Sequence, residues 1–285
     1  MTASGNGMTA AGNGMTTAGD RPTAHGETAM SELLRERQDH IEILTINRPE
    51  ARNAINGAVS RQFAAAFDEL EADDECSVVI ITGSENKAFS AGMDLKAFAA
   101  GEAGDIMGSD GGFAGITQRD FAKPVIAAVN GPALAGGCEI MLSCDLVVAV
   151  EEAIFGIPEV KRGLIAGAGG LIRLPKRIPP AIALELALTG DPIDARRALA
   201  LGLINRVVPA ASLMDEALAL AGVIADNAPL AVRASKRVMK QAGELPDAQG
   251  WAINSAAVPE VFSSADAMEG SIAFAEKRKP NWSGK

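Results

Sequence analysis

Two glutamates, Glu139 and Glu159, are the side chains in this sequence best suited to chemistry. Glu139 lies in the apolar segment Gly-Gly-Cys-Glu-Ile-Met-Leu, where an unpaired charge would be costly, and Glu159 ends the segment Phe-Gly-Ile-Pro-Glu. Burial raises the pKa of a carboxyl group, and such groups suit general acid and base catalysis near neutral pH. A single buried glutamate is more often a paired structural residue, but two of them beside the loops described next favour proton transfer.

Two loops each place glycine after an apolar segment. The first is Ala-Phe-Ser-Ala-Gly-Met-Asp-Leu at 88–95, and the second is Asn-Gly-Pro-Ala-Leu-Ala-Gly-Gly-Cys-Glu at 130–139. Gly136 and Gly137 at a helix N-terminus would present free backbone N–H groups at the positive end of the helix dipole. One donor from each loop could form an oxyanion hole for a carbonyl that gains negative charge. For either loop alone, tight turns and close packing are the better explanation of the glycines.

Apolar strands alternating with helical segments must position these residues. An alternating segment at 41–46 and fully apolar segments at 78–82, 125–129 and 146–150 predict strands, and 59–70 has helical spacing. Fully apolar strands are typical of sheets buried on both faces, which indicates α/β architecture. From residue 179 the pattern is mainly helical, with one candidate strand at 204–208. The helices predicted there are 180–189, 194–201, 212–226, 229–242 and 265–277.

Composition excludes several classes of function. The 285 residues carry a formal net charge of −10, which disfavours nucleic acid because phosphate binding depends on clustered Lys and Arg. Three cysteines without a Cys-x-x-Cys pair favour a reducing, cytoplasmic location. Two histidines are too few for a His-rich zinc site, so no metal site is expected. No segment reaches the roughly 18 apolar residues that span a bilayer, so no membrane partner is expected.

The chain divides into three parts by sequence character. Residues 1–29 are rich in Gly, Ala and Thr, repeat Gly-Asn-Gly-Met-Thr, and are expected to be a disordered tail. Residues 30–200 are expected to hold the core and the site, and residues 201–285 to form a helical C-terminal region. Met30 is an alternative starting residue, which would make the tail dispensable.

Six segments in a fixed order make the sequence similar to the crotonase (enoyl-CoA hydratase/isomerase) superfamily over about residues 31–285. They are Asn-Arg-Pro-Glu-Ala-Arg-Asn-Ala at 47–54, the loop at 88–95, Ala-Leu-Ala-Gly-Gly-Cys-Glu at 133–139, Phe-Gly-Ile-Pro-Glu at 155–159, Gly-Ala-Gly-Gly at 167–170 and Phe-Ala-Glu-Lys-Arg-Lys at 274–279. The resemblance implies an α/β fold, a crotonase-like spiral of ββα units with a C-terminal helical trimerisation region. It also implies a homo-oligomer, either a trimer or a dimer of trimers, that binds an acyl-CoA thioester.

The resemblance assigns roles to individual residues. The backbone N–H groups of Met93 and Gly136 match the oxyanion donors, Glu139 and Glu159 match the two catalytic carboxylates, and Gly167 matches a position whose N–H helps to place water. The positions that match CoA-binding residues are Arg52, Ala91, Lys96, Phe274 and Lys277, the last two typically reaching a neighbouring subunit. For the charged members of this set, a solvated surface role is the alternative.

Some positions depart from the family pattern. Glu50 stands where many relatives carry a lysine that points toward CoA, so Arg48 or Arg52 would have to compensate. The Gly-rich stretch 101–115 corresponds to the variable part that shapes the acyl pocket. Asp94 is expected to be a structural cap rather than a catalyst.

The activity that the resemblance implies is reversible syn addition of water to a trans-2-enoyl-CoA, giving a 3-hydroxyacyl-CoA, as in the β-oxidation of fatty acids. No cofactor is expected, because coenzyme A is part of the substrate and proton transfer with oxyanion stabilisation covers the reaction. The alternatives are a carnitinyl-CoA-type dehydratase, to which the segment 171–181 is similar, and a Δ3,Δ2-enoyl-CoA isomerase. A non-catalytic CoA-binding or RNA-binding relative is the alternative from a different class.

Overall fold

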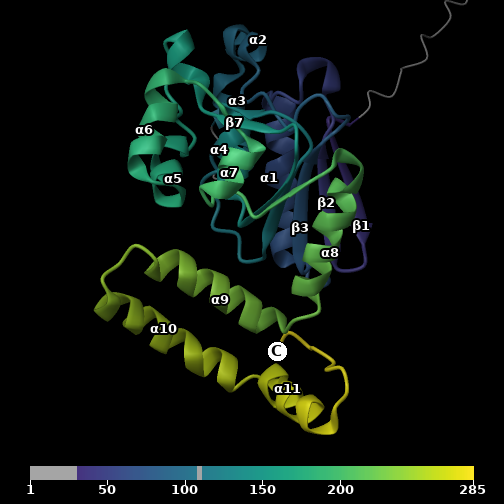
Figure 1. Cartoon of the computed structure of the whole chain (residues 1–285). Coiled ribbons are helices and arrows are strands. Elements are labelled where there is room, and N and C mark those ends of the chain that lie inside the picture. The colour runs from purple at the N-terminus through teal and green to yellow at the C-terminus, as the bar shows by residue number, and fades with distance from the viewer. Residues whose placement is uncertain (1–30, 108–110) are drawn as a thin grey trace, which may run out of the picture. The chain divides into compact units, whose positions relative to one another are not determined.

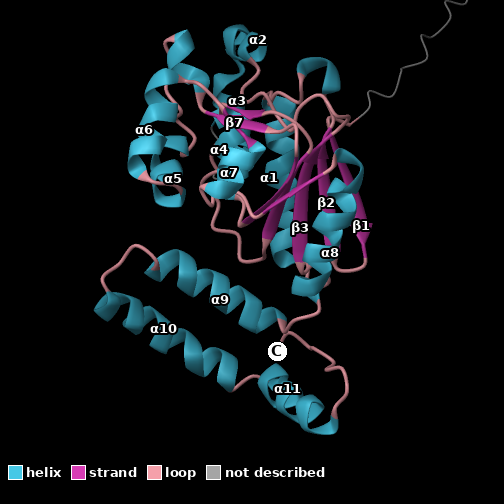
Figure 2. Ribbon diagram, in the orientation of Figure 1, coloured by secondary structure: helices cyan, strands magenta, loops and turns pink. Residues whose placement is uncertain are grey.

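A six-stranded sheet with the order β1-β2-β3-β4-β6-β9 is the framework of the protein (Figures 1 and 2). The computed structural model describes residues 31–107 and 111–285, so the tail predicted at 1–29 lies outside the described residues. β1 and β2 are antiparallel, and every later neighbour in the sheet is parallel. The strands are β1 (Leu33–Gln38), β2 (Ile41–Ile46), β3 (Val78–Gly83), β4 (Val125–Val129), β6 (Leu146–Val150) and β9 (Arg206–Val208).

Helices make up most of the remaining described chain. They are α1 (Gly57–Ala72), α2 (Leu95–Ala97), α3 (Ala103–Met107), α4 (Gly136–Ser143), α5 (Gly170–Arg177), α6 (Pro180–Thr189), α7 (Ala195–Ala200), α8 (Leu213–Ala225), α9 (Pro229–Ala242), α10 (Asp247–Phe262) and α11 (Ala265–Glu276). Short 3-10 or π turns are η1 (Pro49–Ala51), η2 (Phe98–Glu102), η3 (Phe113–Gly115), η4 (Pro158–Arg162) and η5 (Ala210–Ser212). The predicted α/β fold with C-terminal helices is therefore confirmed, whereas α10 was missed.

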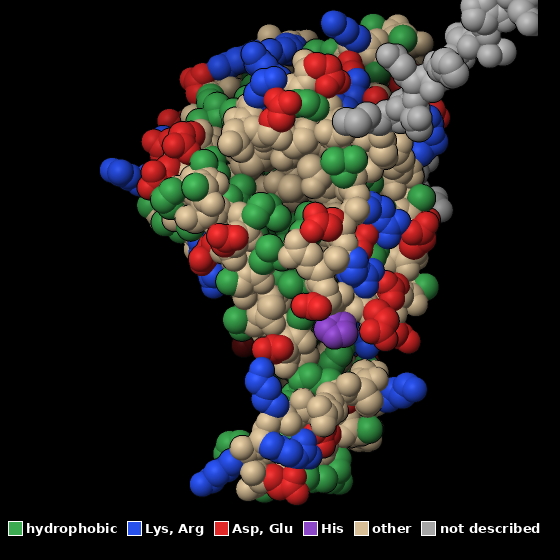
Figure 3. All heavy atoms as spheres, turned by 90° about the vertical axis from the view of Figure 1, so that its right-hand side faces the viewer, with side chains coloured by type: hydrophobic (Ala, Val, Ile, Leu, Met, Phe, Trp, Pro, Cys, Tyr) green, Lys and Arg blue, Asp and Glu red, His purple; other side chains and the backbone are tan. Residues whose placement is uncertain are grey.

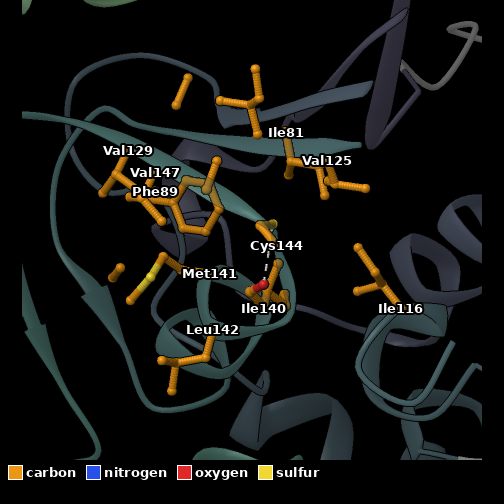
Figure 4. Close-up of a cluster of buried hydrophobic side chains, with 14 of the residues drawn as sticks. Ile81, Phe89, Ile116, Val125, Val129, Ile140, Met141, Leu142, Cys144 and Val147 are labelled. Atoms are coloured by element: carbon orange, nitrogen blue, oxygen red, sulfur yellow. Dashed lines mark hydrogen bonds between the residues drawn. The ribbon is translucent and has the colours of Figure 1, made fainter. Parts of the chain in front are cut away.

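The central strands are buried because helices cover them. Every residue of β3 and of β4 is buried, as expected for parallel strands covered on both faces, and α8 packs against both. Figure 4 shows how Ile140 and Leu142 of α4 join the same apolar cluster as Ile81 and Val125 of the sheet. The cluster reaches Cys144, whose thiol lies 3.3 Å from the carbonyl oxygen of Ile140. The two glutamate-bearing segments thus start from a rigid core.

A second, smaller sheet aligns the two segments that carry the glutamates. Its order is β5-β7-β8, with β5 (Ala133–Leu134) parallel to β7 (Ile154–Gly156), and β8 (Ile193–Asp194) antiparallel to β7. β5 leads into α4 and Glu139, whereas β7 leads into η4 and Glu159. The N–H of Ala135 also donates to the carbonyl of Gly156 at 2.9 Å. This pairing places the two carboxyl-bearing turns side by side.

The last three helices expose an apolar surface. Met239 of α9, Trp251 and Phe262 of α10, and Met268 and Phe274 of α11 are each more than half exposed. No single helix of the described residues is long and apolar enough to cross a membrane. The bent pair Ala210–Ala225 and Pro229–Ala242 reaches that length and apolar composition only when its two helices are taken together.

Candidate active site

The two glycine loops meet at the start of α4. Ser90 pairs with Ala133 in a parallel bridge, and the N–H of Leu134 donates to the carbonyl of Ser90 at 3.1 Å. Gly92 has a φ of 89°, and a Cβ on this residue would lie 2.6 Å from the backbone nitrogen of Gly136. Only glycine permits both the left-handed conformation and so close an approach. The loops predicted to carry the oxyanion donors are therefore in direct contact.

The backbone N–H groups of Met93 and Gly136 are available to a ligand. Ile55 holds the chain on either side of Met93, because its N–H donates to the carbonyl of Gly92 at 2.8 Å and its carbonyl accepts from the N–H of Asp94 at 2.9 Å. Gly136 is the first residue of α4, so its N–H has no partner inside the helix. Within residues 31–107 and 111–285, neither N–H donates a hydrogen bond. Two free donors on adjoining loops have the form of an oxyanion hole.

Glu139 is buried and held by two backbone N–H groups. Its side chain lies in the first turn of α4, and only 3% of the residue is exposed. The N–H groups of Ala168 and Gly170 donate to its Oε1 at 2.7 and 2.8 Å. Burial raises the pKa of this carboxyl, while the two hydrogen bonds and the charge of Arg173 act in the opposite direction. Gly167, predicted to place water, immediately precedes this pair of donors, and its role stays a prediction.

The ionised form of Glu159 has fewer stabilising partners than that of Glu139. It lies in η4, and its Oε2 is buried with no hydrogen-bond partner among the residues that the structure describes. Burial is the main cause that raises its pKa to about 7, and the nearby charge of Glu139 adds to the effect. Its own backbone N–H and Arg162 oppose the shift without cancelling it. The group can therefore hold or release a proton near neutral pH.

The two carboxyls differ in what stabilises their ionised forms. Glu139 accepts hydrogen bonds from two N–H groups, and its charge adds to the increase in the pKa of Glu159. An ionised carboxylate beside a protonated carboxyl is the arrangement that acid–base catalysis requires. The catalytic roles of the two glutamates and of the two N–H donors stay predictions.

Arg48 and Asp94 support the loop that carries Met93. Asp94 caps α2, and Arg48 donates to its Oδ2 at 3.0 Å and to the carbonyl of Ala54 at 2.7 Å. Burial acts to raise the pKa of Asp94. Hydrogen bonds from the N–H groups of Lys96 and Ala97, together with the guanidinium of Arg48, nevertheless hold this pKa below its usual value. The structural role predicted for Asp94 is confirmed. Arg48 is engaged in these contacts with 13% of its side chain exposed, and the suggestion that it could replace a CoA-contacting lysine stays a prediction.

The residues predicted to bind CoA fall into two groups. Arg52 is exposed at the end of η1, Ala91 donates its N–H to the carbonyl of Arg52 at 3.0 Å, and Lys96 is exposed on α2, so these three lie on adjoining segments. Phe274 is 86% exposed on α11, with Lys277 at the cap of that helix. Figure 1 places α11 at the opposite end of the described chain from α2. A single copy therefore does not bring the two groups together.

Metal and thiol chemistry find little support in the described chain. No cluster of three or more potential metal-ligating side chains occurs within the part that the structure describes. Cys76, Cys138 and Cys144 are free and buried, and burial raises the pKa of both Cys138 and Cys144 to about 12. These thiols belong to the core.

Sequence reasoning missed the residues that support Glu139 from other segments. The motif Gly-Ala-Gly-Gly at 167–170 was recognised, but its Ala168 and Gly170 N–H groups were not assigned to the carboxylate. Arg173 and the ring of Phe113, which lies 2.6 Å from where a Cβ of Gly136 would stand, were also missed. The sequence did hold a signal for Arg173, because it is the single cation in the apolar segment Leu-Ile-Arg-Leu at 171–174.

Known proteins similar to this chain were found by sequence and by structure. The sequence model of the family described as enoyl-CoA hydratase/isomerase matches residues 36–285. A carnitinyl-CoA dehydratase of Citrobacter koseri is 46% identical over 262 residues, which cover 90% of this chain and 100% of that protein. The crystal structure of an enoyl-CoA hydratase from Mycobacterium tuberculosis H37Rv has a TM-score of 0.85 at 53% identity, covering 90% of this chain and 100% of that one. A carnitinyl-CoA hydratase from Mycobacterium avium has a TM-score of 0.71 at 46% identity, with coverage of 90% and 100%.

Proposed function

Because the chain belongs to the enoyl-CoA hydratase/isomerase family, we propose that it adds water reversibly across the double bond of a trans-2-enoyl-CoA. The observation that carries this proposal is the coupled pair of Glu139 and Glu159 beside the free N–H groups of Met93 and Gly136. The family is described as enoyl-CoA hydratase/isomerase, and the pair supplies the two proton-transfer groups that hydration needs. The product is a 3-hydroxyacyl-CoA.

Each group has one task in the proposed reaction. The thioester oxygen accepts hydrogen bonds from the N–H groups of Met93 and Gly136, which stabilise the negative charge that develops on it. Glu139, ionised, takes a proton from water as the water oxygen bonds to the β-carbon. Glu159, protonated, gives its proton to the α-carbon. One water is consumed: its O–H bond and the π bond between the α- and β-carbons are broken, and one C–OH and one C–H bond are formed. Exchange with solvent then removes the proton from Glu139 and returns one to Glu159.

Two carboxyls favour hydration over double-bond migration. An isomerase needs one positioned carboxylate to move a proton from one carbon to another, whereas hydration needs a base for water and an acid for carbon. The Oε1 of Glu139 is occupied by two N–H donors, which leaves its other oxygen for a water. Glu159 keeps its proton near neutral pH and so suits the acid.

The proposed CoA site extends from the loops around Met93 to the surface near α2. Arg52, Ala91 and Lys96 lie on adjoining segments there. In Figure 1, α2 lies at the top of the protein, and Figure 3 shows Lys and Arg side chains gathered at the same end. Cations at this place would offset the negative charge of the CoA phosphates. Phe274 and Lys277 would reach CoA from a neighbouring copy, in a homotrimer or a dimer of trimers. The exposed apolar side chains of α9 to α11 support that assembly.

Dehydration of a carnitinyl-CoA is the second candidate, and it is favoured by the name of the curated relative from Citrobacter koseri. Its acyl group carries a quaternary ammonium, which proteins often hold against the faces of Trp or Tyr. This chain has no Tyr, and its two Trp residues, Trp251 and Trp282, lie in the C-terminal region. Phe113 is the aromatic residue that borders the Gly136 donor. The aromatic composition therefore supports an uncharged acyl chain.

Loss of the conjugated enoyl-thioester absorbance tests the proposal directly. The full chain should consume crotonyl-CoA, and Glu139→Gln and Glu159→Gln should each abolish the loss while CoA binding remains. Glu152→Gln is the matched control, because it removes an exposed carboxylate from the segment that precedes Glu159 in the sequence, and it should retain full activity. Turnover of carnitinyl-CoA with no turnover of crotonyl-CoA would establish the second candidate. An active double Gln variant would refute the assigned roles.

A further inference from the structure

Arg173 lies next to the candidate site, and its guanidinium joins two segments that are distant in the sequence. It is on the first turn of α5 and is partly buried. Its Nη2 donates to the carbonyl of Thr117, and its Nη1 lies 3.4 Å from the carbonyl of Ala168. The proposed reaction gives this residue no proton to transfer. Its position nonetheless affects two walls of the site.

One of these walls is the loop that binds Glu139. The N–H groups of Ala168 and Gly170 donate to Oε1 of Glu139 at 2.7 and 2.8 Å, so the conformation of this loop decides where the carboxylate lies. Gly169, between them, has a φ of 107°, and a Cβ there would lie 2.1 Å from Nη1 of Arg173. The loop thus has glycine at the one position that lets the guanidinium approach its backbone.

The other wall borders the oxyanion donor. The N–H of Thr117 donates to the carbonyl of Phe113 at 3.2 Å, so a contact to Thr117 also steadies this turn. The ring of Phe113 packs 2.6 Å from where a Cβ of Gly136 would stand. Arg173 therefore connects the turn beside the Gly136 donor to the loop that holds the catalytic carboxylate.

We infer that Arg173 is a positioning residue that fixes the Ala168–Gly170 loop against Glu139 and sets the place of that carboxylate relative to the Gly136 donor. This inference rests on the proposed function. The charge of Arg173 also favours the ionised form of Glu139 and so opposes the increase in its pKa that burial causes. The other titratable groups that interact with this carboxylate are Glu159 and the buried thiol of Cys138.

Three variants separate positioning from general stability. Arg173→Met removes every donor, and Arg173→Lys retains a charge but cannot bridge two carbonyls. Arg177→Met is the matched control, because Arg177 is one turn further along α5, is also partly buried, and donates to the carbonyls of Leu142 and Cys144. Each variant is measured as the full chain for kcat and KM with crotonyl-CoA across pH. Hydrogen exchange of the peptide covering residues 166–170 is followed by mass spectrometry.

Arg173→Met should lower kcat by about 10- to 100-fold with KM changed by less than about threefold, as expected when a supporting contact is lost. The acid limb of its pH profile should move to higher pH, because Glu139 loses a neighbouring positive charge. Arg173→Lys should keep the acid limb of wild type with a reduced kcat. The amides of residues 168 and 170 should exchange faster in Arg173→Met and at the wild-type rate in Arg177→Met.

An acid limb or an amide exchange rate that stays at the wild-type value in Arg173→Met would overturn the inference. The proposed function fails separately, if the wild-type chain turns over neither crotonyl-CoA nor carnitinyl-CoA. In that event the exchange measurement alone decides whether Arg173 fixes the loop.

Discussion

Replacing the proposed acid, Glu159→Gln, should abolish hydration and yet stabilise the fold above neutral pH. The carboxyl has a pKa of about 7 in the folded chain, against an ordinary value of 4.5. At about 1.4 kcal/mol for each pH unit, this difference corresponds to a loss of about 3 kcal/mol when the folded group is forced to ionise. Glutamine has nearly the same shape and carries no charge, so it avoids that loss.

The pH dependence follows from which state binds the proton more tightly. Below pH 4.5 the carboxyl is protonated in both the folded and the unfolded chain, and it contributes nothing to the difference. Between pH 4.5 and about 7 the unfolded chain releases its proton while the folded chain keeps it, so the free energy of unfolding falls as pH rises. Above about pH 7 both states are ionised and the full penalty applies.

Urea unfolding of wild type and Glu159→Gln at about pH 5 and about pH 8.5 measures this effect, at one protein concentration because assembly also affects stability. The variant should be close to wild type at the lower pH and more stable by up to about 3 kcal/mol at the higher pH. Glu152→Gln, which removes an exposed carboxylate, should show no such pH dependence. A variant that is less stable than wild type at the higher pH would refute the argument that burial of an unpartnered carboxyl raises its pKa.

Three further results are expected. The kcat/KM for hydration should fall above about pH 7, where Glu159 loses its proton, and should also fall in acid, where Glu139 gains one. A profile that is flat from about pH 5 to about pH 9 would contradict the acid and base roles of the two glutamates. Gly136→Ala should lower kcat by about 10²- to 10³-fold, because its Cβ would lie 2.6 Å from the ring of Phe113 and displace the N–H donor; turnover near wild type would argue against the oxyanion hole. Arg48→Met should lower the free energy of unfolding measured in urea by about 1.5 to 3 kcal/mol, because the partly buried carboxylate of Asp94 loses its guanidinium donor and keeps only its two backbone N–H donors. Combining it with Asp94→Asn should restore part of the loss.

The sequence predicted those elements that have a local physical cause. The helices at 180–189 and 229–242 have the predicted ends, because Pro stands at the first position of each, and glycine ends the first of them with a φ of 67°. β1 was missed because its sequence, Leu-Leu-Arg-Glu-Arg-Gln, is polar. It is held instead by ion pairs of Arg35 and Arg37 with the buried Glu42. α10 was missed because Gly250 and Pro259 interrupt any helical pattern.

The site was predicted to the extent that its groups occupy recognisable motifs. Glu139 and Glu159 could be singled out, but the small sheet that aligns them has strands of two or three residues, too short for any periodicity to mark. The partners of Glu139 were missed because they lie far from it in the sequence. Ala168 and Gly170 bond it across about thirty residues, and only the folded chain shows that Arg173 reaches the same loop.

The difference between the two glutamates arises from the backbone around them. Glu139 is buried and Glu159 is partly buried, and burial raises the pKa of each. Glu139 recovers part of that loss from two N–H groups, whereas the Oε2 of Glu159 has no partner among the described residues and the pKa of Glu159 rises to about 7. In the proposed reaction, hydration starts with the proton on Glu159 and ends with a proton on Glu139, and dehydration runs through the same two states in reverse. Because both directions need one proton on the pair, the same pH range should serve both, and the concentrations of enoyl and hydroxyacyl thioester then decide the direction.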